Sequence, residues 1–306
     1  MVVSDNTRGI LYMNIAMATF TLNDTFMKLV TQTVPLAQAI SVRGTITVVL
    51  LVILARIMGG LSFRVARRDG WLLGWRTLGE LGGTILFLLA LQHMPLANLS
   101  AILQSLPLAV TLGAALIMGE KVGWRRMTAI LVGFCGVLLI VRPGTDGFDR
   151  WAVLALLSVA CVVLRDLVTR RFSTSMPSVM IALYSAIGVT LMGYAGLAVE
   201  GWQTVTAREA IQLALAASML ICGYLFVVMA MRIGDVAIIA PFRYVSLLWA
   251  IAMGWVAFSA MPDGWTLIGA AIVVATGLYT YLREYQLQRR VAASDAVMTG
   301  VATADR

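Results

Sequence analysis

The chain has 306 residues, of which 60% are hydrophobic and 12% are charged, and its mean hydropathy is +0.89. Soluble domains average roughly 45–50% apolar and 25% charged residues, so these values exclude a soluble enzyme, a disordered chain and a disulfide-rich secreted scaffold. The net charge of +8 does not indicate a nucleic-acid binder, because 21 of the 23 basic residues are arginines scattered between apolar segments.

A helix needs about 20 mainly apolar residues to cross the roughly 30 Å hydrocarbon core of a membrane. Ten segments meet this requirement, in chain order: 10–30, 35–58, 71–91, 96–118, 124–142, 151–169, 177–199, 209–231, 236–260 and 264–283. Short joins with proline or glycine separate most of them. The sequence therefore predicts an all-α polytopic membrane protein with ten transmembrane helices, followed by a cytoplasmic, disordered tail over residues 289–306.

The distribution of lysine and arginine outside these segments predicts the orientation. If the amino terminus is cytoplasmic, 15 basic residues fall on the inner side and three fall on the outer side, namely Arg142, Arg150 and Arg208. Cytoplasmic loops are enriched in basic residues. We therefore expect an even number of spans and both termini in the cytoplasm.

The two halves of the chain resemble each other at an offset of about 142 residues. The matching positions keep their order: Asp24 with Asp166, Lys28 with Arg170, Pro35 with Pro177, Leu91 with Met231, Ala97 with Ala237, and Trp124 with Trp265. Each half, 1–145 and 146–288, holds five spans, so the second copy enters the membrane from the opposite side. Two inverted five-helix repeats are typical of transporters with a central site that opens alternately to either side.

Ionisable residues within the spans are functional candidates, because a charge at membrane depth costs at least about 2.5–3.5 kcal/mol. Eight are present: Asp24, Lys28, Arg43, Arg76, Glu80, Arg165, Asp166 and Arg243. Spacing offers structural explanations for some of them. Arg76 and Glu80 are four residues apart and can pair, as can Asp24 and Lys28, and Arg165 can extend its side chain toward the inner membrane surface.

Arg43 and Arg243 are different, since neither has an acid within one turn of its own helix. Each lies about 10–12 Å from its end of the membrane, so we expect both to face a water-filled cavity. The eight charges leave an excess of two positive charges, which favours a carboxylate, because arginine binds carboxylates through two hydrogen bonds. Expected substrate-binding residues are Arg43, Arg243, Arg165, Arg76, Gln104, Tyr244 and Asn23; expected coupling or pairing residues are Asp24, Lys28, Asp166 and Glu80.

The sequence offers little for other chemistry. His93 is the single histidine, and Cys135, Cys161 and Cys222 have no partner at metal-ligand spacing. A glycine-rich phosphate loop is also absent, so ATP does not drive transport. We therefore expect neither a metal nor a cofactor, and no enzymatic activity.

Several motifs resemble the EamA branch of the drug/metabolite transporter superfamily. They are residues 91–97 (LQHMPLA), 106–108 (LPL), 118–126 (MGEKVGWRR) and 133–144 (GFCGVLLIVRPG), with weaker second copies at 234–237 (GDVA) and 261–265 (MPDGW). In the second copy Pro262-Asp263 stands where the family more often has Gly-Glu. The resemblance covers residues 9 to about 285. It implies ten helices in two inverted repeats, a central cavity and movement of small metabolites across the bacterial inner membrane.

The resemblance does not imply a substrate, although residues 76–95 look like a subgroup related to organic-anion carriers. Our leading hypothesis is a secondary transporter of a small organic anion or zwitterion, working by alternating access as a monomer or homodimer. Asp24 or Asp166 could couple a proton. The alternative is an exporter of aromatic or hydrophobic amino acids or amphipathic drugs, in which the arginines pair internally.

Overall fold

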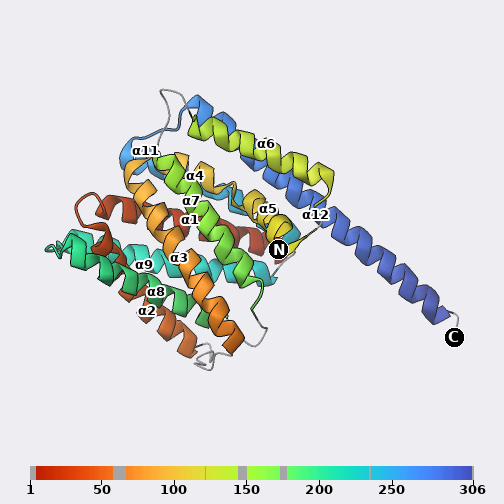
Figure 1. The fold of residues 1–306 in the computed structure, drawn as a ribbon, viewed down its shortest axis with the longest axis horizontal. Coiled ribbons are helices and arrows are strands. Elements are labelled where there is room, and N and C mark those ends of the chain that lie inside the picture. The colour runs from red at the N-terminus through yellow and green to blue at the C-terminus, as the bar shows by residue number, and fades with distance from the viewer. Residues whose placement is uncertain are drawn as a thin grey trace.

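The computed structural model describes residues 5–57, 67–120, 122–143, 150–172, 178–233 and 236–304, and every regular element within them is helical (Figure 1). The elements in chain order are α1 (Asp5–Val30), α2 (Leu36–Ile57), α3 (Arg67–His93), α4 (Leu96–Leu103), α5 (Leu106–Met118), α6 (Trp124–Val141), α7 (Arg150–Thr169), α8 (Ser178–Glu200), α9 (Ala207–Ile233), α10 (Val236–Ile239), the 3₁₀-helix η1 (Ala240–Val245), α11 (Ser246–Phe258) and α12 (Gly264–Ala304).

Within the described residues, nine helical segments are long and apolar enough to cross a membrane, with α4–α5 and η1–α11 each counting as one. The tenth is α1, which has 26 residues but is more polar. Polar side chains in its second half, Asn23 and Lys28 among them, are buried in the bundle, where α1 packs against α9 and α11. These observations confirm the predicted all-α polytopic membrane protein.

The packing partners of the helices show how the two halves are related. Exchanging the first five spans with the second five turns packed pairs of helices into other packed pairs. The pair α1–α9 becomes α3–α7, the pair α2–α9 becomes α3–α8, and the pair α1–α11 becomes α5–α7. The pairs α2–α8 and α6–α12 map onto themselves. This exchange is the signature of a pseudo-two-fold axis between two repeats. Pro177 and residues 234–235, used in the sequence comparison, lie outside the described residues.

The fourth and ninth spans, predicted as continuous helices over 96–118 and 236–260, are both interrupted. The fourth breaks at Gln104 and Ser105 between α4 and α5, and the ninth passes through α10 and η1 before α11 begins. Pro107 and Pro241 stand just after the start of α5 and of η1. Proline has no N–H to donate to the preceding turn, so it ends or kinks a helix. Both interruptions lie beside the centre of the bundle.

The bundle has two unlike ends. The arginine-poor end consists of the last turns of α1, α3, α6, α8 and α11 with the first turns of α2, α4, α7, α9 and α12; the opposite end is the arginine-rich end. The largest cluster of buried apolar side chains includes Val30, Leu36, Leu91, Val141 and Ala152, all near the arginine-poor end. This end is therefore tightly packed.

The carboxyl-terminal tail differs from the prediction. Residues 289–306 were expected to be disordered, but α12 continues to Ala304 and projects beyond the other helices (Figure 1). The segment is rich in alanine, which has the highest helix propensity of all residues. A helix that has already started can also be extended at little cost, because nucleation is the unfavourable step.

Candidate functional site

Two cavities meet at the centre of the bundle. Their volumes are about 530 Å³ and 660 Å³. Both are lined by the same central residues: Phe20, Asp24, Phe87, Leu103, Leu106, Asp166 and Arg243. The larger cavity continues between the second half of α2, the first halves of α3 and α8, and the last turns of α7, all in the arginine-rich half. The two cavities thus form one central site that extends toward the arginine-rich end.

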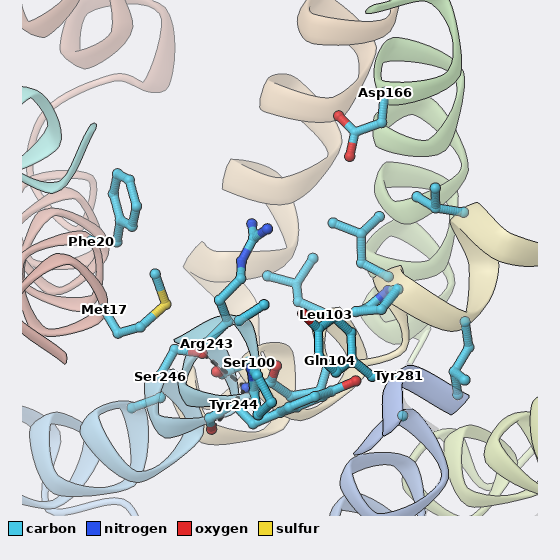
Figure 2. Close-up of a pocket in the computed structure, with 18 of the residues that line it drawn as sticks. Met17, Phe20, Ser100, Leu103, Gln104, Asp166, Arg243, Tyr244, Ser246 and Tyr281 are labelled. Atoms are coloured by element: carbon cyan, nitrogen blue, oxygen red, sulfur yellow. Dashed lines mark hydrogen bonds between the residues drawn. The ribbon is translucent and has the colours of Figure 1, made fainter. Parts of the chain in front are cut away.

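Arg243 occupies the middle of this site. It lies on η1, two residues after Pro241, and its guanidinium group points away from η1 into the cavity between Met17 and Phe20 on one side and Asp166 on the other (Figure 2). The residue is exposed to this space. Among the described residues it makes no hydrogen bond and no ion pair, so its five N–H groups are available to a ligand.

Gln104 connects the two interrupted spans. Its Nε2 atom donates to the hydroxyl of Ser246 at 2.8 Å and to the carbonyl of Tyr244 at 3.3 Å. The hydroxyl end of the Tyr244 ring abuts Gly277 of α12, where a Cβ atom would collide with it. Both predicted binding residues therefore line the smaller cavity, and both hold η1 in the position from which Arg243 projects.

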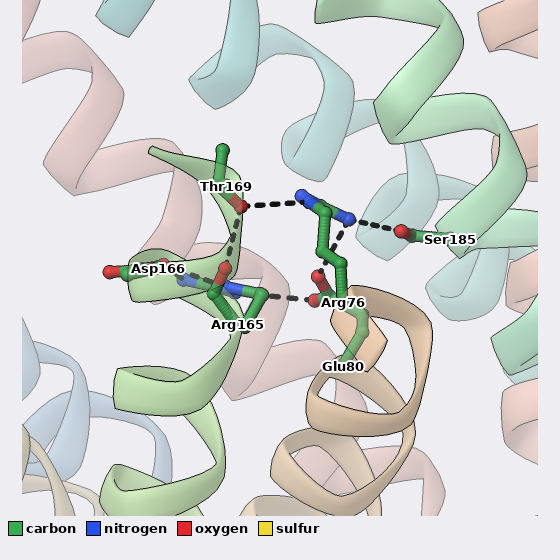
Figure 3. Close-up of polar contacts among 6 residues, drawn as sticks. All are labelled: Arg76, Glu80, Arg165, Asp166, Thr169 and Ser185. Carbon is green, nitrogen blue, oxygen red and sulfur yellow. Dashed lines mark hydrogen bonds and ion pairs between the residues drawn. The ribbon is translucent and has the colours of Figure 1, made fainter. Parts of the chain in front are cut away.

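A compact network of charges lies beside the larger cavity (Figure 3). Arg76 pairs with Glu80 at 3.5 Å, as the spacing predicted. Arg165 pairs with the same carboxylate at 3.3 Å and with Asp166 at 2.9 Å. Two hydroxyl groups accept further hydrogen bonds from Arg76, those of Thr169 and Ser185. Arg165 does not extend toward the membrane surface, which the sequence had left as one option, because Glu80 and Asp166 hold it inside the bundle.

Arg43 is held by α1. Its Nη1 atom donates to Asn23 Oδ1 at 3.1 Å, and the Asn23 amide donates to Asp24 Oδ1 at 2.9 Å. Arg43 lines the larger cavity but is only 8% exposed. The sequence predicted that Arg43 and Arg243 would both face the cavity openly. Arg243 does, whereas Arg43 presents little surface, because a neighbouring helix supplies its partner.

Asp24 and Lys28, whose spacing would allow a pair, do not form one. The Lys28 ammonium instead donates to the backbone carbonyls of Leu91 and Met94, the latter at 2.8 Å. Residue 95 is proline, which leaves the Leu91 carbonyl without the N–H of a following turn. This carbonyl attracts the ammonium away from the same-helix carboxylate. Lys28 belongs to neither cavity.

The charges of the central site leave one cation in excess. Its lining includes five arginines and three acids, namely Arg43, Arg76, Arg165, Arg170 and Arg243 with Asp24, Glu80 and Asp166. Arg170 pairs at 3.6 Å with Glu120, which lies outside both linings. Arg76, Arg165, Glu80 and Asp166 form the neutral network, and Asp24 lies with Arg43. The remaining charge is that of Arg243. In a low-dielectric site such a charge attracts an anion far more strongly than it would in water.

The sequence missed the apolar and peripheral parts of the site. Phe20 and Phe87 face the centre, and Arg170 and Met231 stand where the smaller cavity meets the arginine-rich end. Hydropathy does not distinguish a cavity-facing phenylalanine from a lipid-facing one. The internal repeat could have drawn attention to Arg170 and Met231, because they are the repeat equivalents of Lys28 and Leu91.

Comparison with known proteins shows which family the chain resembles. The model of the EamA-like transporter family matches residues 7–142 and 149–282. A riboflavin transporter of Rhizobium johnstonii is 28% identical over 66% of this chain and 67% of its own length. An S-adenosylmethionine uptake transporter of Rickettsia prowazekii is 26% identical over 62% of this chain and 64% of its own length. The pseudopaline exporter CntI of Pseudomonas aeruginosa (strain UCBPP-PA14) is 27% identical over 87% and 93%.

A solved crystal structure shares the fold. It superposes with a TM-score of 0.62 at 21% identity and covers 91% of this chain and 98% of that chain. The chain thus spans about two thirds of the riboflavin and S-adenosylmethionine relatives and nearly all of the pseudopaline relative. Of these three relatives, the S-adenosylmethionine transporter is named for uptake and the pseudopaline transporter for export.

Proposed function

The chain belongs to the EamA-like transporter family, and from this premise we propose that it moves a small carboxylate-bearing metabolite across the bacterial inner membrane by alternating access. The observation that carries the proposal is Arg243, a cation at the centre of the bundle with no partner among the described residues. A carboxylate fits the planar guanidinium group with two parallel hydrogen bonds and neutralises the excess charge.

The remaining surface of the site defines what else the substrate carries. Met17, Phe20 and Phe87 give the cavity an apolar wall beside Arg243. This wall suits an aromatic or aliphatic body, because ligand sites commonly combine apolar walls with a few convergent polar groups. The substrate class is therefore an organic acid or zwitterion with an apolar portion, rather than an inorganic anion.

The state of the structure supports alternating access. If basic loops are cytoplasmic, the arginine-rich end faces the cytoplasm, both termini lie there, and the central site extends toward that side. Transport then requires the arginine-poor end to open and the arginine-rich end to close. A gradient supplies the driving force, and Asp24 or Asp166, both of which line the two cavities, could carry a coupled proton.

The apolar wall also favours a second candidate function, export of aromatic or hydrophobic amino acids or of amphipathic drugs. In this case the aromatic residues would provide most of the binding energy and Arg243 would contribute little. The pseudopaline relative is named as an exporter, which supports export as the direction in this second candidate. The two candidates differ in their dependence on Arg243.

Transport by purified protein in liposomes tests the proposal. The substrates offered are dicarboxylates, aromatic amino acids and riboflavin, and the variants are Arg243→Gln and Arg243→Lys. We expect at least one carboxylate to be transported, with a loss of about tenfold or more in Arg243→Gln and a smaller loss in Arg243→Lys, because a charge-assisted hydrogen bond is about twice as strong as a neutral one.

Arg125→Gln is the matched control, since Arg125 is exposed at the start of α6 and lies outside the central cavities. Its transport should equal that of the parent. Carboxylate transport that survives Arg243→Gln unchanged would contradict the proposal. Transport of aromatic compounds that is insensitive to Arg243→Gln would favour the alternative.

A further inference from the structure

Lys28 links three helices at the arginine-poor end. It is 9% exposed, and its ammonium donates to the carbonyls of Leu91 and Met94 in and after the last turn of α3. The same ammonium lies 5.5 Å from the centre of the Phe258 ring at the end of α11. The carboxyl end of a helix carries a partial negative charge, which stabilises a cation placed there. Lys28 thus joins α1 to α3 and to α11 of the second repeat.

Other polar contacts close the same end across the two repeats. Gln38 and Gln203 exchange two hydrogen bonds, at 2.7 Å and 3.0 Å, and the Glu200 carboxylate accepts from the Ala37 amide at 2.8 Å. Gln38 is fully buried and Lys28 is 9% exposed. The Lys28 ammonium donates to the carbonyls of Leu91 and Met94, and both of these residues belong to the largest cluster of buried apolar side chains.

The repeat equivalent of Lys28 is Arg170, at an offset of 142 residues, and the equivalent of Leu91 is Met231, at an offset of 140. Both Arg170 and Met231 line the smaller cavity near the arginine-rich end. The Arg170 side chain is 49% exposed and pairs with Glu120 at 3.6 Å. Ion pairs with this exposure contribute little stability. The surroundings of Lys28 are thus closed at the arginine-poor end, whereas the equivalent surroundings of Arg170 are open at the arginine-rich end.

We infer that Lys28 and Arg170 are the paired gate residues of the two repeats. Lys28 bonded to the last turn of α3 holds the arginine-poor end shut in the present state. In the opposite state Arg170 bonds to the last turn of α9, at the Met231 carbonyl, and the Lys28 contacts are released. The inference rests on the proposed alternating-access function and assigns the residues that set the balance between its two states.

Cysteine accessibility measures this balance without any substrate. The protein is placed in lipid nanodiscs after Cys135, Cys161 and Cys222 are replaced by alanine, and Met94→Cys provides one reporter thiol. Met94 is 2% exposed in the closed arginine-poor end. The measured quantity is the rate of reaction with a water-soluble maleimide, which rises with the population of the state open at this end.

The two gate residues should change this rate in opposite directions. Lys28→Met should raise it about tenfold, because the closed state loses hydrogen bonds to a charged group, and Arg170→Met should lower it, because the opposite state loses its closing contact. Lys28→Arg should stay within about twofold of the parent, since guanidinium keeps the charge and the donors. Arg171→Met, the exposed neighbour of Arg170, is the control and should leave the rate unchanged.

A general loss of stability would raise the rate in both variants, so equal signs would overturn the inference, as would an unchanged rate in both. If Lys28→Met does not fold, the decrease predicted for Arg170→Met decides the matter by itself. The result is independent of the carboxylate proposal, because labelling needs no ligand. If the gate assignment is wrong, the result expected from the Arg243 transport experiment does not change. If the substrate class is wrong, the result expected from cysteine labelling does not change.

Discussion

Four of the five arginines that line the central site, those nearest its middle, avoid the cost of an isolated buried charge in three different ways. Arg76 and Arg165 share the carboxylate of Glu80. Arg43 is bonded to Asn23 beside a carboxylate of α1. Arg243 is exposed to the cavity. Since a fully desolvated charge without a partner costs several kcal/mol, an unpaired arginine at this depth requires either water or a bound anion, and transport substrates can provide the latter.

Asp263, just before α12 at the arginine-poor end, allows a pH test outside the membrane spans. Its Oδ1 atom accepts from the Thr266 amide at 2.8 Å, which caps the helix, and its other oxygen accepts from Arg142. Hydrogen bonds to Thr266, followed by Arg142, lower the pKa of Asp263 below its ordinary value of 3.8. The carboxylate is therefore stabilising above that value, and this contribution is lost as the pH falls through the lowered pKa.

Asp263→Ala should accordingly reduce stability by about 1 kcal/mol at neutral pH, as for other helix caps. Thermal unfolding of the parent and the variant, followed from pH 7 down to below pH 3.8, measures the difference. We expect the two melting temperatures to converge only below this value. A difference that is constant across the range would show that the charge of Asp263 contributes nothing.

Part of the site could be predicted from the sequence. The four-residue spacing of Arg76 and Glu80 is a property of a single helix, and the structure shows the pair. The sequence also places Arg243 within a span, and the residue lines both central cavities. The partners of Lys28 and Arg165 lie on other helices. Spacing along one helix fixes neither its rotation nor the groups that face it, so these contacts could not be predicted.

At the scale of elements, close approach between helices depends on small residues. The helices α6 and α12 cross at Gly136 and Gly269, where a Cβ atom on Gly136 would come within 2.8 Å of the Gly269 carbonyl oxygen. Because apolar side chains gain little by leaving lipid for protein, membrane helices associate through such close backbone contacts. Gly74, on α3, has no atom within 4 Å of the corresponding position.

These two glycines make a matched pair for a packing test. Gly136→Ala should lower stability by about 1–3 kcal/mol, because the methyl group forces α6 and α12 apart. Gly74→Ala should raise it by up to about 1 kcal/mol, because alanine favours the helix over the unfolded chain. Melting temperatures in one detergent measure both. Destabilisation of similar size in the two variants would contradict the crossing described here.

The positions of the spans could be predicted closely, but their interruptions could not. The predicted segment 71–91 lies within α3, which runs Arg67–His93. Hydropathy averages over about 20 residues and does not detect a break of two residues such as Gln104-Ser105. Pro107 and Pro241 indicated flexibility. Whether a proline bends a membrane helix or divides it depends on the groups that take over the released carbonyls.

At the scale of the molecule, two equivalent repeats adopt unequal positions. Their packing partners exchange under the pseudo-two-fold axis, yet the arginine-poor end is closed and the central site extends toward the other end. Two copies of one structural unit can exchange these roles, which gives a second state with the opposite end open. The duplication and the inverted repeats could be predicted from the sequence, because an odd number of spans per copy dictates inversion. Which end is closed depends on packing between helices.

The most direct test of the account is the effect of ligands on the melting temperature of the purified protein, with each carboxylate compared with its own carboxamide. We predict that at least one carboxylate raises the melting temperature of the parent, that its carboxamide does not, and that Arg243→Gln abolishes the shift. Equal shifts from a carboxylate and its carboxamide, or a full shift in Arg243→Gln, would contradict a central site built around Arg243 for a carboxylate.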